Sequence, residues 1–173
     1  QIGTSVAQVQ AWGWTVCYED AGAYVYGANP SLASILAGCS GTHVMLADGA
    51  AGAASFNILA AARREDVLFD TGGYGNNSTH TANGTEWYFN DNLSIGYTAL
   101  GNGVTLDGCD TRLGAWQGVT PNIGSCWTTG GGALVGGWGF NDGQFQASLN
   151  RFILVADNAE PVDVPEPGSL ALM

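Results

Sequence analysis

The chain has 173 residues, of which 46% are hydrophobic and only 11% are charged, and its formal net charge at pH 7 is −11. This length suits one domain with a hydrophobic core, and this balance of residues excludes an intrinsically disordered chain. Lysine is absent, and all four basic residues are arginines. So acidic a chain would be repelled by phosphate groups, which argues against nucleic acid as a partner.

The first predicted elements are two strands and a helix. Residues 2–9 are uncharged and compatible with β-structure, so residues 1–10 are predicted to hold an edge strand, paired within the molecule or exchanged with a neighbour. Residues 12–18 are rich in aromatic and β-branched side chains, which predicts a strand. Residues 31–38 are predicted to form the one short helix, because Ser31 can cap it and Pro30 ends the preceding segment.

Short strand-like segments follow along the rest of the chain. They cover residues 43–47, 55–61, 67–69, 87–89, 94–99, 133–135, 138–140 and 152–155. The polar stretch 72–83 is predicted to be a long surface loop. Strands at this spacing predict an all-β fold, an antiparallel β-sandwich or jelly roll, in a single domain over residues 1–157. Residues 158–173, with prolines and acidic residues, are predicted to be a tail.

Four cysteines, an even number, indicate two disulfides formed in an oxidising compartment. The sequence separations favour the local pairs Cys17–Cys39 and Cys109–Cys126, while three connectivities stay open on sequence alone. A zinc site built from all four cysteines is disfavoured, because the closely spaced cysteine pairs typical of such sites are absent.

The tail contains Val164-Pro165-Glu166-Pro167 followed by a short apolar run. Because proline fixes φ and lacks an amide hydrogen, this stretch is a stiff, exposed spacer. It resembles the PEP-CTERM sorting signal of Gram-negative bacteria, with Pro165, Glu166 and Pro167 as its Pro-Glu-Pro triplet. The resemblance implies an exported protein that is handled by a sorting enzyme, an exosortase, and associated with extracellular polysaccharide or biofilm. The membrane-spanning helix and basic cluster of that signal do not follow within these residues.

The sharpest chemical motif runs from Val67 to Gly72 and contains Asp70-Thr71-Gly72. It resembles the catalytic loop of aspartic proteases, which makes Asp70 a catalytic candidate. That chemistry needs two carboxylates sharing one proton, so this single motif would have to meet a second copy in a homodimer. The alternative is structural, because an aspartate at a turn accepts hydrogen bonds from local backbone amides. No complete catalytic set is predicted.

Four Asn-x-Ser/Thr triplets mark candidate sites of glycan attachment, namely Asn76, Asn77, Asn83 and Asn92. The alternative is that these residue types simply crowd polar loops. The two histidines, His43 and His80, have no Cys, Asp or Glu at a recognised ligand spacing. No metal site or catalytic triad is therefore predicted for them.

The abundance of aromatic residues suggests sugar binding, because aromatic faces stack on sugar rings. The stacking candidates, which lie beside turns rich in Gly, Asn or Thr, are Trp87, Trp116, Trp127 and Trp138. Most aromatic residues of β-proteins pack in the core instead. No cofactor is predicted. Calcium stays an open alternative without a location, because the carboxylates of Glu86, Asp107, Asp110 and Asp142 are not part of a recognised calcium loop.

These patterns together predict a non-catalytic secreted protein of the bacterial surface or extracellular matrix, in which copies self-associate into filaments or contact extracellular polysaccharide. Residues 35–39, 66–72 and 84–89 resemble segments of secreted proteins of the same sorting class. The second functional hypothesis is a carbohydrate-binding module, and the third is an aspartic-protease-like enzyme that uses Asp70. No stretch of about 18 apolar residues occurs, so no membrane span is predicted within the sequence.

Overall fold

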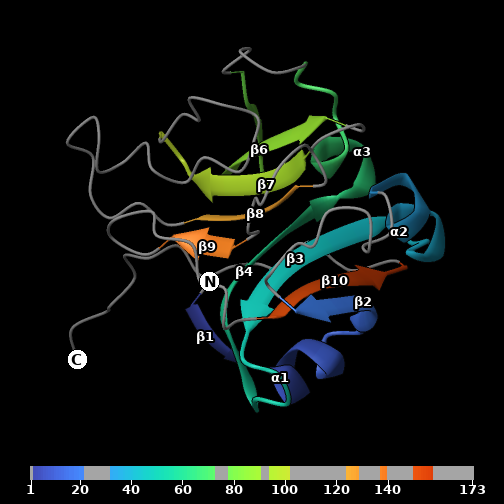
Figure 1. Ribbon diagram of the computed structural model, residues 1–173, viewed down its shortest axis with the longest axis vertical. Coiled ribbons are helices and arrows are strands. Elements are labelled where there is room, and N and C mark those ends of the chain that lie inside the picture. The colour runs from blue at the N-terminus through green and yellow to red at the C-terminus, as the bar shows by residue number, and fades with distance from the viewer. Residues whose placement is uncertain are drawn as a thin grey trace, which may run out of the picture.

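Two five-stranded antiparallel sheets pack face to face in the computed structural model of this chain (Figure 1). The structure describes residues 2–21, 32–72, 78–90, 94–101, 124–128, 137–139 and 150–157. Every strand pair among these residues is antiparallel. The predicted all-β sandwich is therefore confirmed.

Sheet A has the strand order β1-β4-β3-β10-β2. In that order its strands are β1 (Ile2–Ser5), β4 (Ser55–Arg63), β3 (His43–Gly49), β10 (Asn150–Ala156) and β2 (Thr15–Ala21). Strand β10, the last of the chain, lies between β3 and β2 and pairs with both. Sheet A therefore contains both the first and the last strand of the described chain.

Sheet B has the strand order β5-β6-β7-β8-β9. Its strands are β5 (His80–Ala82), β6 (Thr85–Asn90), β7 (Ser94–Ala99), β8 (Gly124–Thr128) and β9 (Gly137–Gly139). Asn83 and Gly84 connect β5 to β6, with φ of 48° and 67°, values that Asn-Gly hairpin turns favour. The prediction of a loop over residues 72–83 is therefore wrong at residues 80–82, which form β5. The strand β8 was not predicted.

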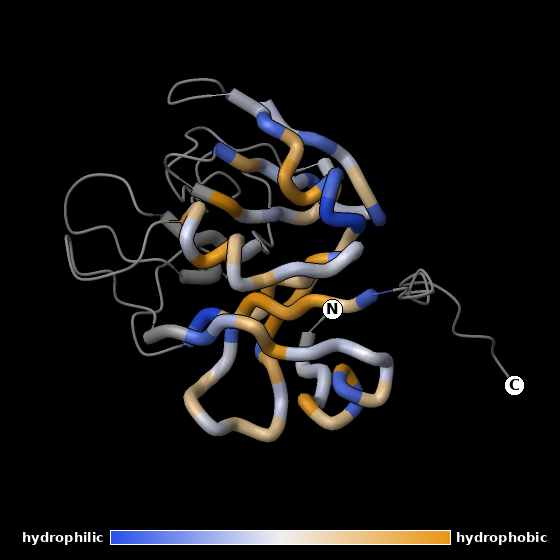
Figure 2. Tube along the Cα trace, turned by 90° about the vertical axis from the view of Figure 1, so that its right-hand side faces the viewer, coloured by the Kyte–Doolittle hydropathy of each residue, from blue (hydrophilic) through white to orange (hydrophobic). Residues whose placement is uncertain are grey.

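The main core lies between the two sheets and under α2 (Leu32–Gly38). Its largest members are Leu32, Ile35 and Leu36 of α2, Val44, Leu46, Ile58 and Ile153 of sheet A, and Trp87, Phe89, Ile95 and Tyr97 of sheet B. Figure 2 shows hydrophobic stretches of the chain meeting in the middle of the molecule. The predicted short helix is confirmed as α2, and it buries Leu32, Ile35 and Leu36.

A second buried cluster lies on the other face of sheet A, beneath α1 (Val6–Ala11). Here Val9 is completely buried and belongs to one cluster with Trp14 and Phe152. The predicted edge strand is confirmed as β1, which pairs with β4 of the same chain. The prediction that β-structure continues to Val9 is wrong, because the Ser5 side chain accepts a hydrogen bond from the amide of Gln8 at 3.1 Å and starts a helix.

A third helix, α3 (Arg64–Val67), replaces the strand predicted at residues 67–69. The guanidinium of Arg64 donates hydrogen bonds to the carbonyls of Leu36 and Cys39 at the end of α2. A helix C-terminus leaves carbonyls unpaired and carries a partial negative charge, so a guanidinium stabilises it. Arg64 thereby connects α3 to α2.

One predicted disulfide is present, between Cys17 of β2 and Cys39 just after α2. Their Cα atoms are 5.3 Å apart, and the Cys39 side chain is fully buried. The bond fastens α2 to the edge of sheet A. Cys109, and the side chain of Cys126 in β8, lie outside the part of the chain that the structure describes, so their predicted pairing stays a prediction.

Replacing both Cys17 and Cys39 by serine should lower the free energy of unfolding by about 3 kcal/mol, because the unfolded chain regains the freedom of the closed loop. Urea unfolding followed by tryptophan fluorescence measures this change. A Cys39→Ser single variant is the matched control and should lose about as much as the double variant. Equal midpoints for the double variant and the oxidised wild type would contradict the stabilising role.

Candidate functional site

The structure places only some of the residues predicted from the sequence to form sites. Trp87 is completely buried, packs against Tyr97 and donates its indole N–H to the carbonyl of Ala82 at 3.1 Å. Its predicted role as a sugar-stacking surface is therefore wrong, because no face of the ring is exposed. Trp116, and the side chains of Trp127 and Trp138, lie outside the described part of the structure.

Of the asparagines predicted as glycan acceptors, only Asn83 is described. Its side chain is exposed in the β5–β6 turn, and its Nδ2 donates to the carbonyl of Ala61 at 2.8 Å. This amide therefore connects sheet B to β4 of sheet A. Asn76, Asn77 and Asn92 lie outside the described residues.

The Asp70-Thr71-Gly72 motif follows α3 and is bound to the end of β6. Oδ1 of Asp70 accepts the amide hydrogen of Gly72 at 2.8 Å, which is the turn geometry that the sequence offered as the alternative to catalysis. Thr71 is buried, and its hydroxyl bonds to both the amide and the carbonyl of Phe89 at 3.2 Å. Asp70 itself is exposed.

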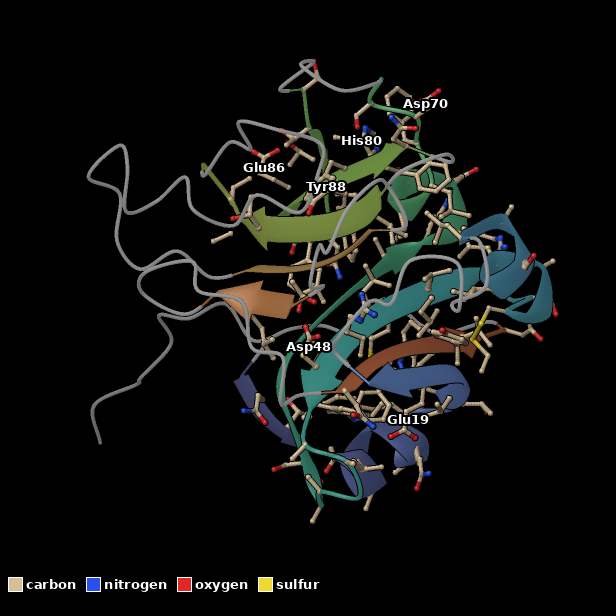
Figure 3. The ribbon with its side chains drawn as sticks, viewed as in Figure 1. Glu19, Asp48, Asp70, His80, Glu86 and Tyr88 are labelled. Atoms are coloured by element: carbon tan, nitrogen blue, oxygen red, sulfur yellow. A yellow bond between two sulfur atoms is a disulfide. The ribbon has the colours of Figure 1, made fainter. Side chains whose placement is uncertain are left out.

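An aromatic surface lies beside this motif and consists of Phe69 and His80, which we call the Phe69–His80 patch. The two rings are stacked, with centroids 4.5 Å apart and planes inclined by 20°. Nε2 of His80 lies 2.9 Å from Oδ1 of Asp66 in α3. Figure 3 shows His80 between Asp70 and Glu86, on the side of the molecule where α3 lies.

The sequence did not predict this patch, because a strand was predicted at residues 67–69 and a loop at residues 72–83. A strand at residues 67–69 would not bring Asp66 to His80, whereas the helix α3 does so. The turn residues Asn83-Gly84 were the signal that could have found β5 and placed His80 opposite Trp87.

A second group of polar residues is buried between the sheets, and we call it the inter-sheet cluster. Asp48 of β3 and Arg151 of β10 are direct cross-strand partners and are 0% and 5% exposed. On the facing sheet, Tyr97 of β7 is paired with Ser125 of β8, and both are buried. Figure 3 shows Asp48 between the two sheets. Both Asp48 and Gly49 lie within β3, which extends beyond the strand predicted at residues 43–47.

Burial raises the pKa of Asp48 to about 7, although the Ser125 side chain and the Arg151 guanidinium both favour its charged form. Neither oxygen of Asp48 makes a hydrogen bond of ordinary length and angle with a described residue. Ser125 and Arg151 therefore offset only part of the increase in pKa that burial causes. Burial, and then the charge of Asp48, also hold the pKa of Tyr97 well above its usual value.

A cavity of about 20 Å³ adjoins the inter-sheet cluster, with Ser125, Arg151, Tyr18 and Ile95 among its lining residues. This volume holds about one water molecule. The inter-sheet cluster is therefore an internal polar centre, whereas the Phe69–His80 patch lies at the surface.

Within the described ranges, no three His, Cys, Asp or Glu side chains are grouped so that they could hold a metal ion. No helix in the same ranges is long and apolar enough to cross a membrane. No protein-family model, curated protein or solved structure matches this chain.

Proposed function

We propose that this chain is an exported, non-catalytic protein of the bacterial surface or extracellular matrix. The observation that carries the proposal is the disulfide between Cys17 and Cys39. Disulfides that staple a fold persist in oxidising compartments and are rare in the cytosol. A structural bond of this kind therefore supports export.

Two properties of the sequence point in the same direction. The lysine-free, acidic composition gives a net charge of −11, which favours solubility and disfavours binding to anionic surfaces. The Val164-Pro165-Glu166-Pro167 motif resembles a sorting signal of exported proteins. A disulfide-bonded domain followed by such a motif supports retention at the cell surface.

Fractionation of the source bacterium tests the proposal. An antibody against the chain should find it in the surface and matrix fractions, and Cys17 and Cys39 should resist alkylation until a reductant is added. Replacing Pro165 and Pro167 by alanine should move the chain out of the surface fraction, because the stiff spacer is lost. Recovery in the cytosol with alkylatable Cys17 and Cys39 would overturn the proposal.

A further inference from the structure

The Phe69–His80 patch presents an aromatic ring to solvent. The Phe69 side chain is 52% exposed, and Leu100 is the only other large hydrophobic residue of the described chain that is comparably exposed. Most aromatic side chains in the same ranges are buried, including Trp87, which the sequence had suggested as a binding surface. The Phe69 ring is therefore an aromatic surface that a ligand can reach.

The ring of Phe69 is held in place before any ligand arrives. It stacks on the imidazole of His80, whose Nε2 is in turn 2.9 Å from Oδ1 of Asp66. The backbone that follows is fixed by the turn at Asp70 and by the bonds of buried Thr71 to Phe89. Such preorganisation lowers the entropy that a ligand loses on binding.

The chemistry around the ring selects the class of ligand. An aromatic face attracts the apolar C–H face of a sugar ring, and the exposed carboxylate of Asp70 accepts hydrogen bonds from hydroxyl groups. Oδ1 of Asp70 accepts the amide hydrogen of Gly72, and an ionised carboxylate keeps further acceptor positions for hydroxyl groups. The carboxylates of Asp66 and Asp70 and the net charge of −11 disfavour polyanions.

We infer that the Phe69–His80 patch is a binding site for an uncharged polysaccharide, with the free face of the Phe69 ring stacked on a sugar and Asp70 bonded to its hydroxyls. The inference deepens the proposed extracellular function and rests on it for the source of the polysaccharide. His80 and Asp66 are positioning residues, since they act by holding the Phe69 ring.

Native gel electrophoresis of the whole chain tests the site, with hydroxyethylcellulose, dextran or galactomannan cast into the gel. At least one of these neutral polysaccharides should retard the wild type, and polygalacturonate, a polyanion, should not. Phe69→Ala should weaken the retardation about tenfold or more, because the stacking surface is removed. Phe69→Trp should keep it, because a larger aromatic face remains.

Leu100→Ala is the matched control. Leu100 is 60% exposed but follows the end of β7 that pairs with Thr85, whereas Asp70 and Thr71 adjoin Phe89 at the opposite end of β6. This variant should bind like the wild type, and near-wild-type melting temperatures should show that both alanine variants fold.

Equal retardation of Phe69→Ala and wild type would overturn the site. Retardation by polygalacturonate alone, or by none of the four polymers, would overturn the ligand class. Any of these results would leave the proposed export standing, because export is read from cell fractions and thiol protection.

Discussion

Replacing Asp48 by asparagine is expected to remove a strong pH dependence from the stability of this protein. The pKa of Asp48 is raised from 3.8 to about 7 in the fold. Between about pH 4 and pH 7 the unfolded chain therefore loses this proton while the folded chain keeps it, and stability falls as pH rises. A shift of this size corresponds to a loss on the order of 4 kcal/mol.

Urea unfolding at pH 5 and pH 8 measures this effect. At pH 5 Asp48→Asn should already be more stable than the wild type by about 2 kcal/mol, because the unfolded wild type has released this proton while the fold still holds it. At pH 8 the variant should be the more stable protein by several kcal/mol, because it buries no carboxylate charge.

Glu65→Gln is the matched control for this experiment, since the Glu65 side chain is 76% exposed. It should keep the pH dependence of the wild type. Parallel pH profiles for the wild type and Asp48→Asn would show that Asp48 does not bind its proton more tightly in the fold.

Replacing Trp87 by alanine should destabilise the fold by about 3–5 kcal/mol, the range for removing a large aromatic side chain from a core. Trp87 is completely buried between the sheets, contacts Tyr97 with ring centroids 5.3 Å apart, and donates to the carbonyl of Ala82. The change removes these contacts and leaves a cavity at the centre of sheet B. Chemical denaturation measures the loss.

Trp87→Phe is the control, since it keeps most of the apolar volume and loses chiefly the hydrogen bond to Ala82. It should cost clearly less than Trp87→Ala, and it should bind neutral polysaccharide like the wild type. If Trp87→Phe stayed stable but lost polysaccharide binding, Trp87 would have to contact the sugar.

Much of the fold could be predicted from local patterns. The helix α2, the strands β6 and β7 and the disulfide between Cys17 and Cys39 are confirmed. Each depends on signals close in sequence, such as the Ser and Pro before the helix. The misassigned elements, α1, α3 and β5, are short. Local signals exist for α1 in the Ser5 cap and for β5 in the Asn83-Gly84 turn, whereas α3 is held by the bonds of Arg64 to the end of α2.

The candidate sites depend on the tertiary structure. His80 has no acidic neighbour at a familiar spacing, yet α3 brings Asp66 to it and the turn after α3 brings Phe69. Trp87 was placed at the surface because it follows polar turn residues. It is buried because it belongs to the core cluster between the two sheets.

The sequence by itself determined the fold class and the resemblance of the tail to a sorting signal, because periodicity and proline placement act over short distances. Cysteine spacing favoured the Cys17–Cys39 disulfide, and the structure selected it among the open connectivities. Only the tertiary structure decided which aromatic ring is exposed and which carboxylate is buried. Exposure depends on how the two sheets pack, and that packing places Phe69 in solvent and encloses Asp48 with Arg151.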